Sequence, residues 1–490
     1  MEKTEVDIEL SLELGKNFCV SSKCYPIGLS NDGYEIAVAK YDELLLEALQ
    51  LRTEKNIRLI ELETRTFESQ LKKIAESSGH SLGDQFKNLD KSEIAIGDEN
   101  SVEELRKKSN IEPVVKLVNE IIDRAVSEGA TDIHIESVEK AVKVRFRKDG
   151  MLRKALELPV WVQAPLVSRI KVLAELDIAE KRIPHDGRIK WMNSGEAVDL
   201  RVSTLPTRLG EKVVLRVLKH AFYVSRLDSL GMQQTIYKAI QEIVNKPQGM
   251  FFVTGPTGSG KTSSLYAALR EIVSKDINIS TIEDPIEYRM DGANQVQVNE
   301  KAGLTFASAL RSLLRQDPDV ILVGEIRDEE TAEIAVRAAQ TGHLVFATLH
   351  TNDAISAVTR LRDLKIKPFL ISSTVLGIMA QRLVRKVCPE CHVMEAPTKE
   401  ELLFMSDLPD LCPKAVGCKS CGFTGYSGRT GVFEMLQMNN RIKEAILNEE
   451  GEHKIKEYSG MRTLLLDGFT KIKEGLTTPA ELMRVAMSEE

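Results

Sequence analysis

The sequence predicts an α/β fold with a mainly parallel sheet in the middle of the chain. From about residue 227 to 385, short apolar runs alternate with helical patterns, as βαβ units require. Four of these runs have the length and composition of buried strands: residues 250–254, 277–282, 320–323 and 344–349. Ligands of open α/β sheets bind at the carboxyl ends of the strands, so the residues that follow these runs should meet at one edge.

A phosphate-binding loop follows the first of these strands. Residues 255–262 read GPTGSGKT, which satisfies the pattern G-x-x-x-x-G-K-[ST], and a helical pattern follows. Backbone N–H groups of such a loop surround phosphates, Lys261 would contact the β- and γ-phosphates, and Thr262 would place its hydroxyl on Mg²⁺. The residues expected to bind ATP are Gly255, Pro256, Thr257, Gly258, Ser259, Gly260, Lys261, Thr262 and Ser263.

The other three strands end in residues that can carry chemistry. Glu283 ends one in TIEDPIE, Glu325 follows another in DVILVGEIRD, and His350 follows the third in GHLVFATLHTND. Taken alone, an acid after a strand is commonly a helix cap, and a single histidine is commonly structural. In this order after a P-loop they favour a catalytic site, with Glu325 facing the water shell of Mg²⁺.

Charge and hydropathy limit the classes of protein that fit. The chain has 490 residues and a formal net charge of -7, and residues 1–100 hold 12 Lys or Arg against 20 Asp or Glu. This acidic start favours a separate N-terminal module, and the absence of overall positive charge argues against a general nucleic-acid-binding surface. The start, MEKTEVDIEL, does not have the pattern of a signal peptide, and no apolar run approaches the roughly 18 residues that span a bilayer. We therefore expect a cytoplasmic protein.

Composition and periodicity divide the chain into six segments. The segments are an N-terminal module (1–85), a polar linker (86–110), an α+β domain with an antiparallel sheet (111–220), the α/β core that carries the P-loop (221–385), a cysteine module (386–425) and a helical C-terminal region (426–490). The α+β domain should open on a helix, because Leu117, Val118, Ile121 and Ile122 share a helical face. A second helix is expected over about residues 164–180.

The cysteine module has the spacing of a metal site. Seven cysteines in a chain without a secretion signal do not make a disulfide framework. CPEC supplies Cys388 and Cys391, and CKSC supplies Cys418 and Cys421 after 26 intervening residues. Two such pairs give the four thiolates of a closed, structural Zn²⁺ site, for which reduced or redox-active cysteines are the alternative. Cys412 lies outside both pairs and is expected to be an ordinary residue.

The motifs together resemble those of a known superfamily. GPTGSGKT, TIEDPIE, LRQDPDVILVGEIRD and TGHLVFATLHTND are similar to the Walker A motif, Asp box, Walker B motif and His box of the secretion ATPases, in the same order. RIPHDGRI and the two cysteine pairs are similar to those of the assembly ATPases of type II secretion and type IV pilus extension. The resemblance is dense over residues 112–490 and looser before them, where it favours the type II form. It implies a RecA-like core.

The resemblance also implies roles for single residues. Lys261 and Thr262 would hold phosphate and Mg²⁺, Glu325 would act through the water shell of the metal, and Glu283 would orient or deprotonate the attacking water, although either glutamate can be the base. His350 would contact the γ-phosphate. Arginines that match family positions lining the site or subunit interfaces are Arg201, Arg216, Arg311, Arg315, Arg327 and Arg360. His185 departs from the family, which usually has glutamine there.

Arg201 and Arg216 belong to the α+β domain, and in the family such arginines close over the nucleotide. Positive charge delivered to the leaving phosphates accelerates phosphoryl transfer by orders of magnitude, which is a physical reason for the role. Ion pairs with carboxylates of their own sheet are the alternative.

The resemblance implies that this P-loop protein is an ATP-hydrolysing motor that acts on a type II secretion apparatus and drives pseudopilus assembly. The resemblance implies a homo-hexamer. Residues 1–100 would bind an inner-membrane component that has a cytoplasmic domain, so the motor would lie at the inner membrane through this partner, and acidic phospholipid is a second candidate partner. The alternatives are a type IV pilus extension ATPase, a nucleic-acid translocase, and a scaffold that binds nucleotide without turnover; nucleic acid is not an expected partner.

Overall fold

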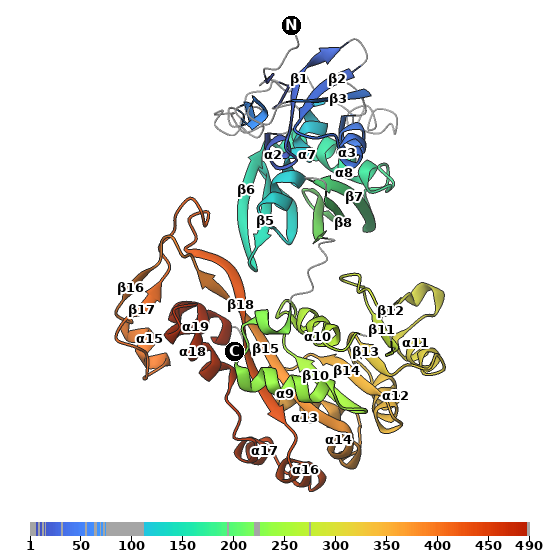
Figure 1. Cartoon of the computed structure of the whole chain (residues 1–490), viewed down its shortest axis with the longest axis vertical. Helices are drawn as coiled ribbons and strands as arrows, with labels where there is room; N and C mark the ends of the chain where they lie inside the picture. Colours follow the sequence, from blue (N-terminus) through green and yellow to red (C-terminus); the bar gives the residue numbers. More distant parts are fainter. Residues whose placement is uncertain are drawn as a thin grey trace. The chain divides into compact units, whose positions relative to one another are not determined.

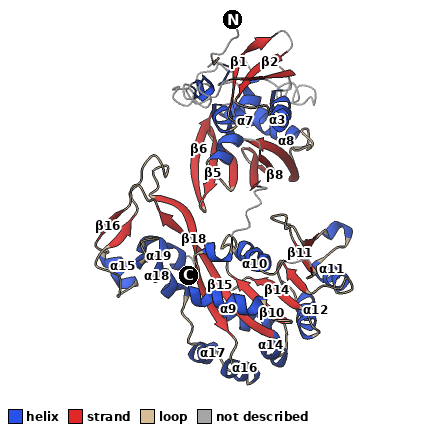
Figure 2. Cartoon of the chain, viewed as in Figure 1, coloured by secondary structure: helices blue, strands red, loops and turns tan. Residues whose placement is uncertain are grey.

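The computed structural model describes two compact units, residues 1–221 and 222–490, drawn in Figures 1 and 2. The residues described are 6–7, 10–11, 14, 16–30, 33–53, 56–62, 66–68, 70–71, 74, 112–193, 196–219, 226–273 and 276–487. The polar linker expected over residues 86–110 lies outside them. None of the helices in these ranges combines the length and the apolar character needed to cross a bilayer.

The first unit begins with a small three-stranded sheet. Its elements are α2 (Lys16–Ser21), β1 (Cys24–Ser30), β2 (Gly33–Val38), α3 (Glu43–Thr53) and β3 (Asn56–Glu61). β1 pairs with β2 antiparallel and β2 pairs with β3 parallel. Phe18, Tyr25, Ile36 and Leu49 fill its core, because each is almost fully buried. This part of the chain therefore buries enough apolar surface to form a core of its own.

A six-stranded antiparallel sheet forms the rest of this unit. Its elements are α7 (Glu112–Ser127), β4 (Asp132–Val138), β5 (Ala141–Lys148), β6 (Met151–Leu158), a 3₁₀ turn (Val160–Val162), α8 (Gln163–Leu173), β7 (His185–Asn193), β8 (Glu196–Thr207) and β9 (Gly210–Lys219). The strand order is β6-β5-β4-β9-β8-β7. Leu117 and Ile121 of α7 pack with Ile133 and Leu215 of the sheet. Trp191 Nε1 donates to Asp123 of α7 at 2.8 Å and joins β7 to this helix.

The helix expected over residues 164–180 is shorter in the structure. α8 ends at Leu173, and Ala174 is its C-cap residue. Glu175 has φ = 56°, in the left-handed region, and Leu176 N donates to Lys171 O at 2.8 Å. This hydrogen-bond pattern terminates a helix, so the chain cannot continue the α8 axis beyond Ala174. The apolar residues after it, such as Ile178, are buried outside the helix.

The second unit contains a seven-stranded sheet. Its strands are β10 (Gly249–Thr254), β11 (Ile279–Glu283), β12 (Ala293–Gln297), β13 (Val320–Val323), β14 (Leu344–Leu349), β15 (Val375–Val387) and β18 (Tyr426–Gln437). The order is β12-β11-β13-β14-β10-β15-β18, and all neighbours are parallel except β15 and β18. The α/β class and the mainly parallel sheet predicted from the sequence are therefore confirmed.

Helices cover both faces of this sheet (Figure 1). The helices of this part are α9 (Gln234–Val244), α10 (Lys261–Arg270), α11 (Phe306–Leu313), α12 (Glu329–Gln340), α13 (Ser356–Asp363) and α14 (Pro368–Thr374). Leu265 of α10 packs with Phe251 and Phe346 on one face. Leu310 of α11 packs with Ile321 and Val345 on the other. The strands carry apolar residues on both sides because both sides are covered.

The C-terminal third adds a two-stranded sheet and further helices. These elements are β16 (Val393–Glu395), α15 (Lys399–Phe404), β17 (Cys412–Lys414), α16 (Asn440–Leu447), α17 (Glu452–Ser459), α18 (Leu464–Lys473) and α19 (Pro479–Met487), with two 3₁₀ turns earlier at Leu227–Leu230 and Glu300–Ala302. The helical C-terminal region begins with β18, which periodicity did not predict. This strand pairs with β15 from Gly377 to Val387 and completes the large sheet.

Candidate active site and metal centre

The P-loop has the backbone conformation that its glycines allow. Gly255, Gly258 and Gly260 have φ values of 142°, 82° and 88°, which other residues rarely adopt. A Cβ on Gly255 would lie 2.5 Å from Gln381 O, so β15 approaches the loop too closely for a side chain. Gly260 is the N-cap residue of α10, so the free N–H groups of this helix lie next to the loop.

Two side chains of the loop fit an anionic ligand. Ser259 is 4% exposed, and its hydroxyl has no hydrogen-bond partner among the described residues. Lys261 Nζ donates to Gly255 O at 2.7 Å and to Pro256 O at 3.2 Å. Burial lowers the pKa of Lys261 to about 8, with Glu325 opposing this shift and Arg382 adding to it. A cation held in this way can exchange backbone carbonyls for phosphate oxygens.

Glu325 and His350 meet at the carboxyl end of the sheet. Glu325 follows β13, His350 follows β14, and these strands are neighbours. His350 Nε2 lies 3.3 Å from Glu325 Oε2, while Arg327 pairs with Oε1 of the same carboxylate. The charge of Glu325 raises the pKa of Lys261, so Lys261 lies within electrostatic range of the carboxylate that His350 contacts.

Buried threonines hold these strand ends in place. Thr348 of β14 donates from Oγ1 to Gly324 O at 2.6 Å. Thr254 of β10 forms hydrogen bonds with Thr351 through its Oγ1, including one from Thr351 N at 2.9 Å. The segments that carry the P-loop, Glu325 and His350 are therefore tied to one another at their ends.

Glu283 is in a different environment, inside the protein. It is 3% exposed, and Tyr266 of α10, Thr281 of β11 and Gln295 of β12 donate hydrogen bonds to its carboxylate. Burial raises the pKa of Glu283, and these donors oppose that shift. The carboxylate therefore contacts side chains of α10, β11 and β12, while its Cγ lies close to Gly324, the residue before Glu325.

The other arginines of this unit that the sequence predicted for the site or subunit interfaces lie in two places. Arg360 Nη2 donates to Arg327 O at 3.4 Å, which links it to the ion pair of Glu325. Arg311 pairs with Glu330, and Arg315 Nη1 donates to Arg311 O at 2.9 Å. Arg311 lies on α11 and Arg315 just after its end, and they form a surface group, since Arg311 is half exposed.

Arg201 and Arg216 lie on the six-stranded sheet of the first unit. They face each other on β8 and β9, with Arg188 of β7 opposite Arg201. Asp132 of β4 lies opposite Arg216 and pairs with it at 3.2 Å, and Arg147 of β5 lies on the other side of Asp132. Directly paired positions share a face, so four arginines and one aspartate form a row across the strands. Arg188 and Arg147 were not among the residues predicted, although cross-strand register would have indicated them.

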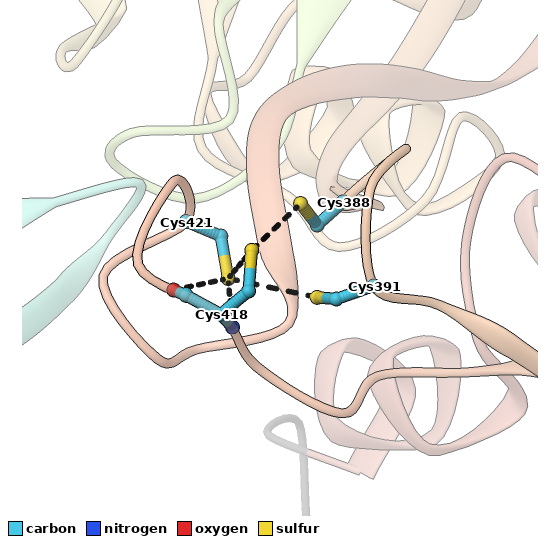
Figure 3. A group of neighbouring side chains, drawn as sticks. All are labelled: Cys388, Cys391, Cys418 and Cys421. Atoms are coloured by element: carbon cyan, nitrogen blue, oxygen red, sulfur yellow. Dashed lines mark hydrogen bonds between the residues drawn. The ribbon is translucent and has the colours of Figure 1, made fainter.

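The four cysteines of the two pairs come together, as Figure 3 shows. Their sulfur atoms all lie within 4.8 Å of one another, and Cys388–Cys418, Cys391–Cys421 and Cys418–Cys421 are separated by 3.9, 3.8 and 3.8 Å. A tetrahedron of Zn–S bonds of about 2.3 Å has edges of about 3.8 Å, so these residues fit Zn²⁺. Backbone N–H groups of Gly417 and Gly425 donate to Cys391 and Cys421 sulfurs, as neighbours of thiolates do.

Comparison with known proteins decides the family. A family model described as type II/IV secretion system protein matches residues 107–484. The chain belongs to this family. It is 47% identical over 388 residues to the type II secretion system ATPase E of Vibrio cholerae, covering 78% of this chain and 77% of that protein. It is 49% identical over 392 residues to the type II secretion system protein E of Pseudomonas aeruginosa, covering 79% and 78%.

Two pilus proteins are also similar to this member of the family. The type IV pilus assembly ATPase PilB of Thermus thermophilus is 46% identical over 376 residues, which cover 75% of this chain and 42% of PilB. The crystal structure of the pilus retraction motor PilT with bound ADP is 29% identical with a TM-score of 0.53, covering 75% of this chain and 96% of that one. This secretion-family protein is therefore an ATPase with the core of such motors.

Proposed function

We propose that the chain is the ATP-hydrolysing motor of a type II secretion apparatus and that hydrolysis drives pseudopilus assembly. The observation that carries the proposal is the grouping of Lys261, Glu325 and His350 beside a P-loop in a chain that matches type II secretion ATPases over most of both lengths. Secretion by this route requires mechanical work at the inner membrane. Hydrolysis of ATP supplies that work.

Each residue of the site has a proposed task. Bound ATP and Mg²⁺ supply the phosphoryl group and the charge that the reaction needs. Gly255–Ser263 holds phosphates through backbone N–H groups, Lys261 adds a point charge, and Thr262 offers its hydroxyl to the metal. Glu325 acts through the water shell of the metal, and His350 contacts the γ-phosphate. Glu283 orients or deprotonates the attacking water.

The arginines would add positive charge to the leaving phosphates. Arg201 and Arg216 act from the α+β domain, and Arg311, Arg315, Arg327 and Arg360 line the site or subunit interfaces. Arginine delivered at this point of phosphoryl transfer is worth several orders of magnitude in rate. Closure of the α+β domain would then be coupled to hydrolysis, and a homo-hexamer would provide the interfaces.

The share of each relative that is matched favours secretion over pilus extension. The chain spans more than three quarters of the type II proteins but 42% of PilB. A type IV pilus extension ATPase is therefore the second candidate. A nucleic-acid translocase is third, since the overall charge is -7.

The partner side of the proposal concerns the N-terminal module and the cysteine module. Residues 1–100 bind the cytoplasmic domain of an inner-membrane secretion component, which places a cytoplasmic motor at the membrane; acidic phospholipid is a further partner.

Zn²⁺ held by Cys388, Cys391, Cys418 and Cys421 would stabilise the segment after the ATPase core.

The experiment measures ATP turnover against protein concentration for the wild type and Glu325→Ala. Arms with the partner's cytoplasmic domain and acidic phospholipid vesicles, and with DNA or RNA, separate the candidates. We expect turnover per subunit to rise with concentration, to rise further with partner and lipid, and to be insensitive to nucleic acid. Stimulation by nucleic acid alone would support the translocase instead.

A pull-down uses the full chain as bait, in which residues 1–100 are the proposed binding segment. Capture of a type II inner-membrane component supports secretion, and capture of a pilus component supports pilus extension. Glu325→Ala should bind the same component, because the substitution lies outside residues 1–100.

A further inference from the structure

A buried hydrogen-bonded cluster surrounds Glu283. Its members are Tyr266 on α10, Thr281 on β11 and Gln295 on β12. Tyr266 donates to Glu283 Oε2, while Thr281 Oγ1 and Gln295 Nε2 donate to Oε1 at 2.7 and 3.2 Å. Gln295 Nε2 also lies 3.2 Å from the hydroxyl of Tyr266, which closes the cluster. Both carboxylate oxygens are thus occupied by donors.

Neighbouring chain segments hold the members of this cluster in place. Met290 N donates to Gln295 Oε1 at 2.8 Å, and Gln295 Nε2 reaches Tyr288 O at 2.9 Å. The ring of Tyr288 packs edge-on against that of Tyr266, with centroids 6.1 Å apart. Tyr266 itself is fully buried. Its hydroxyl therefore has little freedom to leave the carboxylate.

Tyr266 also belongs to the element that carries Lys261. Both residues lie on α10, which begins at the P-loop. A hydroxyl that contacts Glu283 and a lysine that contacts the phosphate loop are thus fixed on one short helix. The P-loop helix and the end of β11 cannot move independently while this hydrogen bond is present.

We propose that Tyr266 is a positioning residue, which holds Glu283 in its orientation and keeps it ionised for hydrolysis. The inference rests on the proposed role of Glu283. A buried carboxylate must be deprotonated to accept a proton, and burial works against this by raising its pKa. The hydroxyl of Tyr266 donates to the charged form and works in the opposite direction. Without the hydroxyl, Glu283 is protonated up to a higher pH.

The groups around Glu283 are one acidic residue, which raises its pKa, and several neutral ones, among which Tyr266 donates a hydrogen bond that can be removed by a single substitution. Glu287, in the loop that follows β11, raises the pKa of Glu283 by charge repulsion. Thr281 and Gln295 are neutral donors, and Tyr288 contributes its ring and its backbone carbonyl to the cluster. No lysine or arginine forms an ion pair with Glu283 in the part of the chain that the structure describes. Neutral hydrogen bonds are therefore what opposes the rise in the pKa of this carboxyl group.

The test is the pH profile of kcat/KM for ATP hydrolysis in the full chain. Tyr266→Phe removes one oxygen and keeps the ring, and we expect the acid limb to move upward by about one pH unit. Gln295→Glu sets a second carboxyl group against Glu283 and should move the limb further in the same direction. Tyr288→Phe is the matched control and should leave the limb in place. Thermal unfolding of each variant checks that it is folded.

The outcomes separate this inference from the proposed function. If Glu283→Gln abolishes turnover and Tyr266→Phe shifts the acid limb, the positioning role stands. An inactive Glu283→Gln together with an unmoved limb in both Tyr266→Phe and Gln295→Glu overturns the role of Tyr266 alone. Full activity of Glu283→Gln overturns the role of Glu283 and that of Tyr266 with it, while the motor function stands on Glu325.

Discussion

The imidazole Nε2 of His350 lies 3.3 Å from Oε2 of Glu325. The two residues follow neighbouring strands, and the hydrogen bond from Thr348 to Gly324 O holds these strand ends together. The side chain of His350 is half exposed and that of Glu325 is 12% exposed. The histidine can therefore contact a ligand in solvent while its other neighbour is a carboxylate that the protein holds still.

The first prediction concerns this histidine. His350→Gln should lower kcat about 10- to 100-fold with a smaller change in KM, because a contact made to the transferred phosphoryl group acts mainly in the transition state. His343 lies before the other end of β14 and its Nδ1 forms a 2.9 Å hydrogen bond with Ala338 O. His343→Gln is the control and should keep wild-type turnover. Equal losses in both variants would point to the stability of β14 instead.

The second prediction concerns the pH dependence of ATP binding. The pKa of Lys261 is about 8 in the nucleotide-free protein because of burial. The protonated lysine attracts phosphate, so the dissociation constant for Mg-ATP should rise as pH increases through 8, by roughly tenfold per unit above it. Isothermal titration calorimetry between pH 7 and 9.5 measures this. Lys261→Arg binds more weakly but stays charged, so its affinity should be almost flat over that range. A flat wild-type curve would contradict the prediction.

The third prediction concerns the cysteine cluster. The purified protein should contain about one zinc per chain, and Cys418→Ser should lose the metal and several degrees of melting temperature, because a closed tetracysteine site contributes its binding energy to folding. Cys412 is the control: it is buried, whereas Cys418 is only partly buried, and its sulfur contacts Pro409 O at 3.5 Å, outside the cluster. Cys412→Ser should keep the zinc. Elemental analysis measures the zinc, and thermal unfolding measures the melting temperature. A wild type that contains no zinc and melts at the same temperature as Cys418→Ser would contradict the prediction.

Particular elements explain what the sequence predicted and what it did not. β13 spans Val320–Val323 as expected, since a run of four apolar residues that ends at Gly324 is too short for a helix and has the composition of a buried strand. β18 was not predicted, because Gly428, Arg429 and Gly431 interrupt its apolar pattern, and pairing with β15 rather than local propensity forms the strand.

The same distinction applies within the candidate site. The order of motifs indicated that Glu325 and His350 would meet, because both follow parallel strands of one sheet. The contact between Tyr266 and Glu283 joins a helix to a strand through side-chain orientation, which periodicity alone does not specify. The predicted length of α8 was wrong for a similar reason, because the left-handed residue that ends the helix is Glu175 and not a glycine, which the sequence would have shown.

The last prediction concerns the arginine row of the six-stranded sheet. Arg216 pairs with Asp132 at 3.2 Å, yet its side chain is 57% exposed, so the pair contributes at most about 1 kcal/mol to stability. Arg201 lies between Arg216 and Arg188 on adjacent strands, and like charges placed opposite each other repel. The row offers positive charge from β7, β8 and β9 to an anion.

Arg201→Gln and Arg216→Gln should therefore lower kcat about 100- to 1000-fold and change the free energy of unfolding by less than about 1 kcal/mol. Turnover in the presence of the membrane partner and urea unfolding measure the two quantities. Arg182→Gln is the control, because this arginine is 88% exposed and pairs with Glu180 away from the row. If the row only supports its own sheet, Asp132→Asn should destabilise the fold as much as Arg216→Gln while turnover stays at the wild-type level in both. Loss of turnover in the arginine variants alone, with Asp132→Asn still active, would assign the positive charge to the nucleotide.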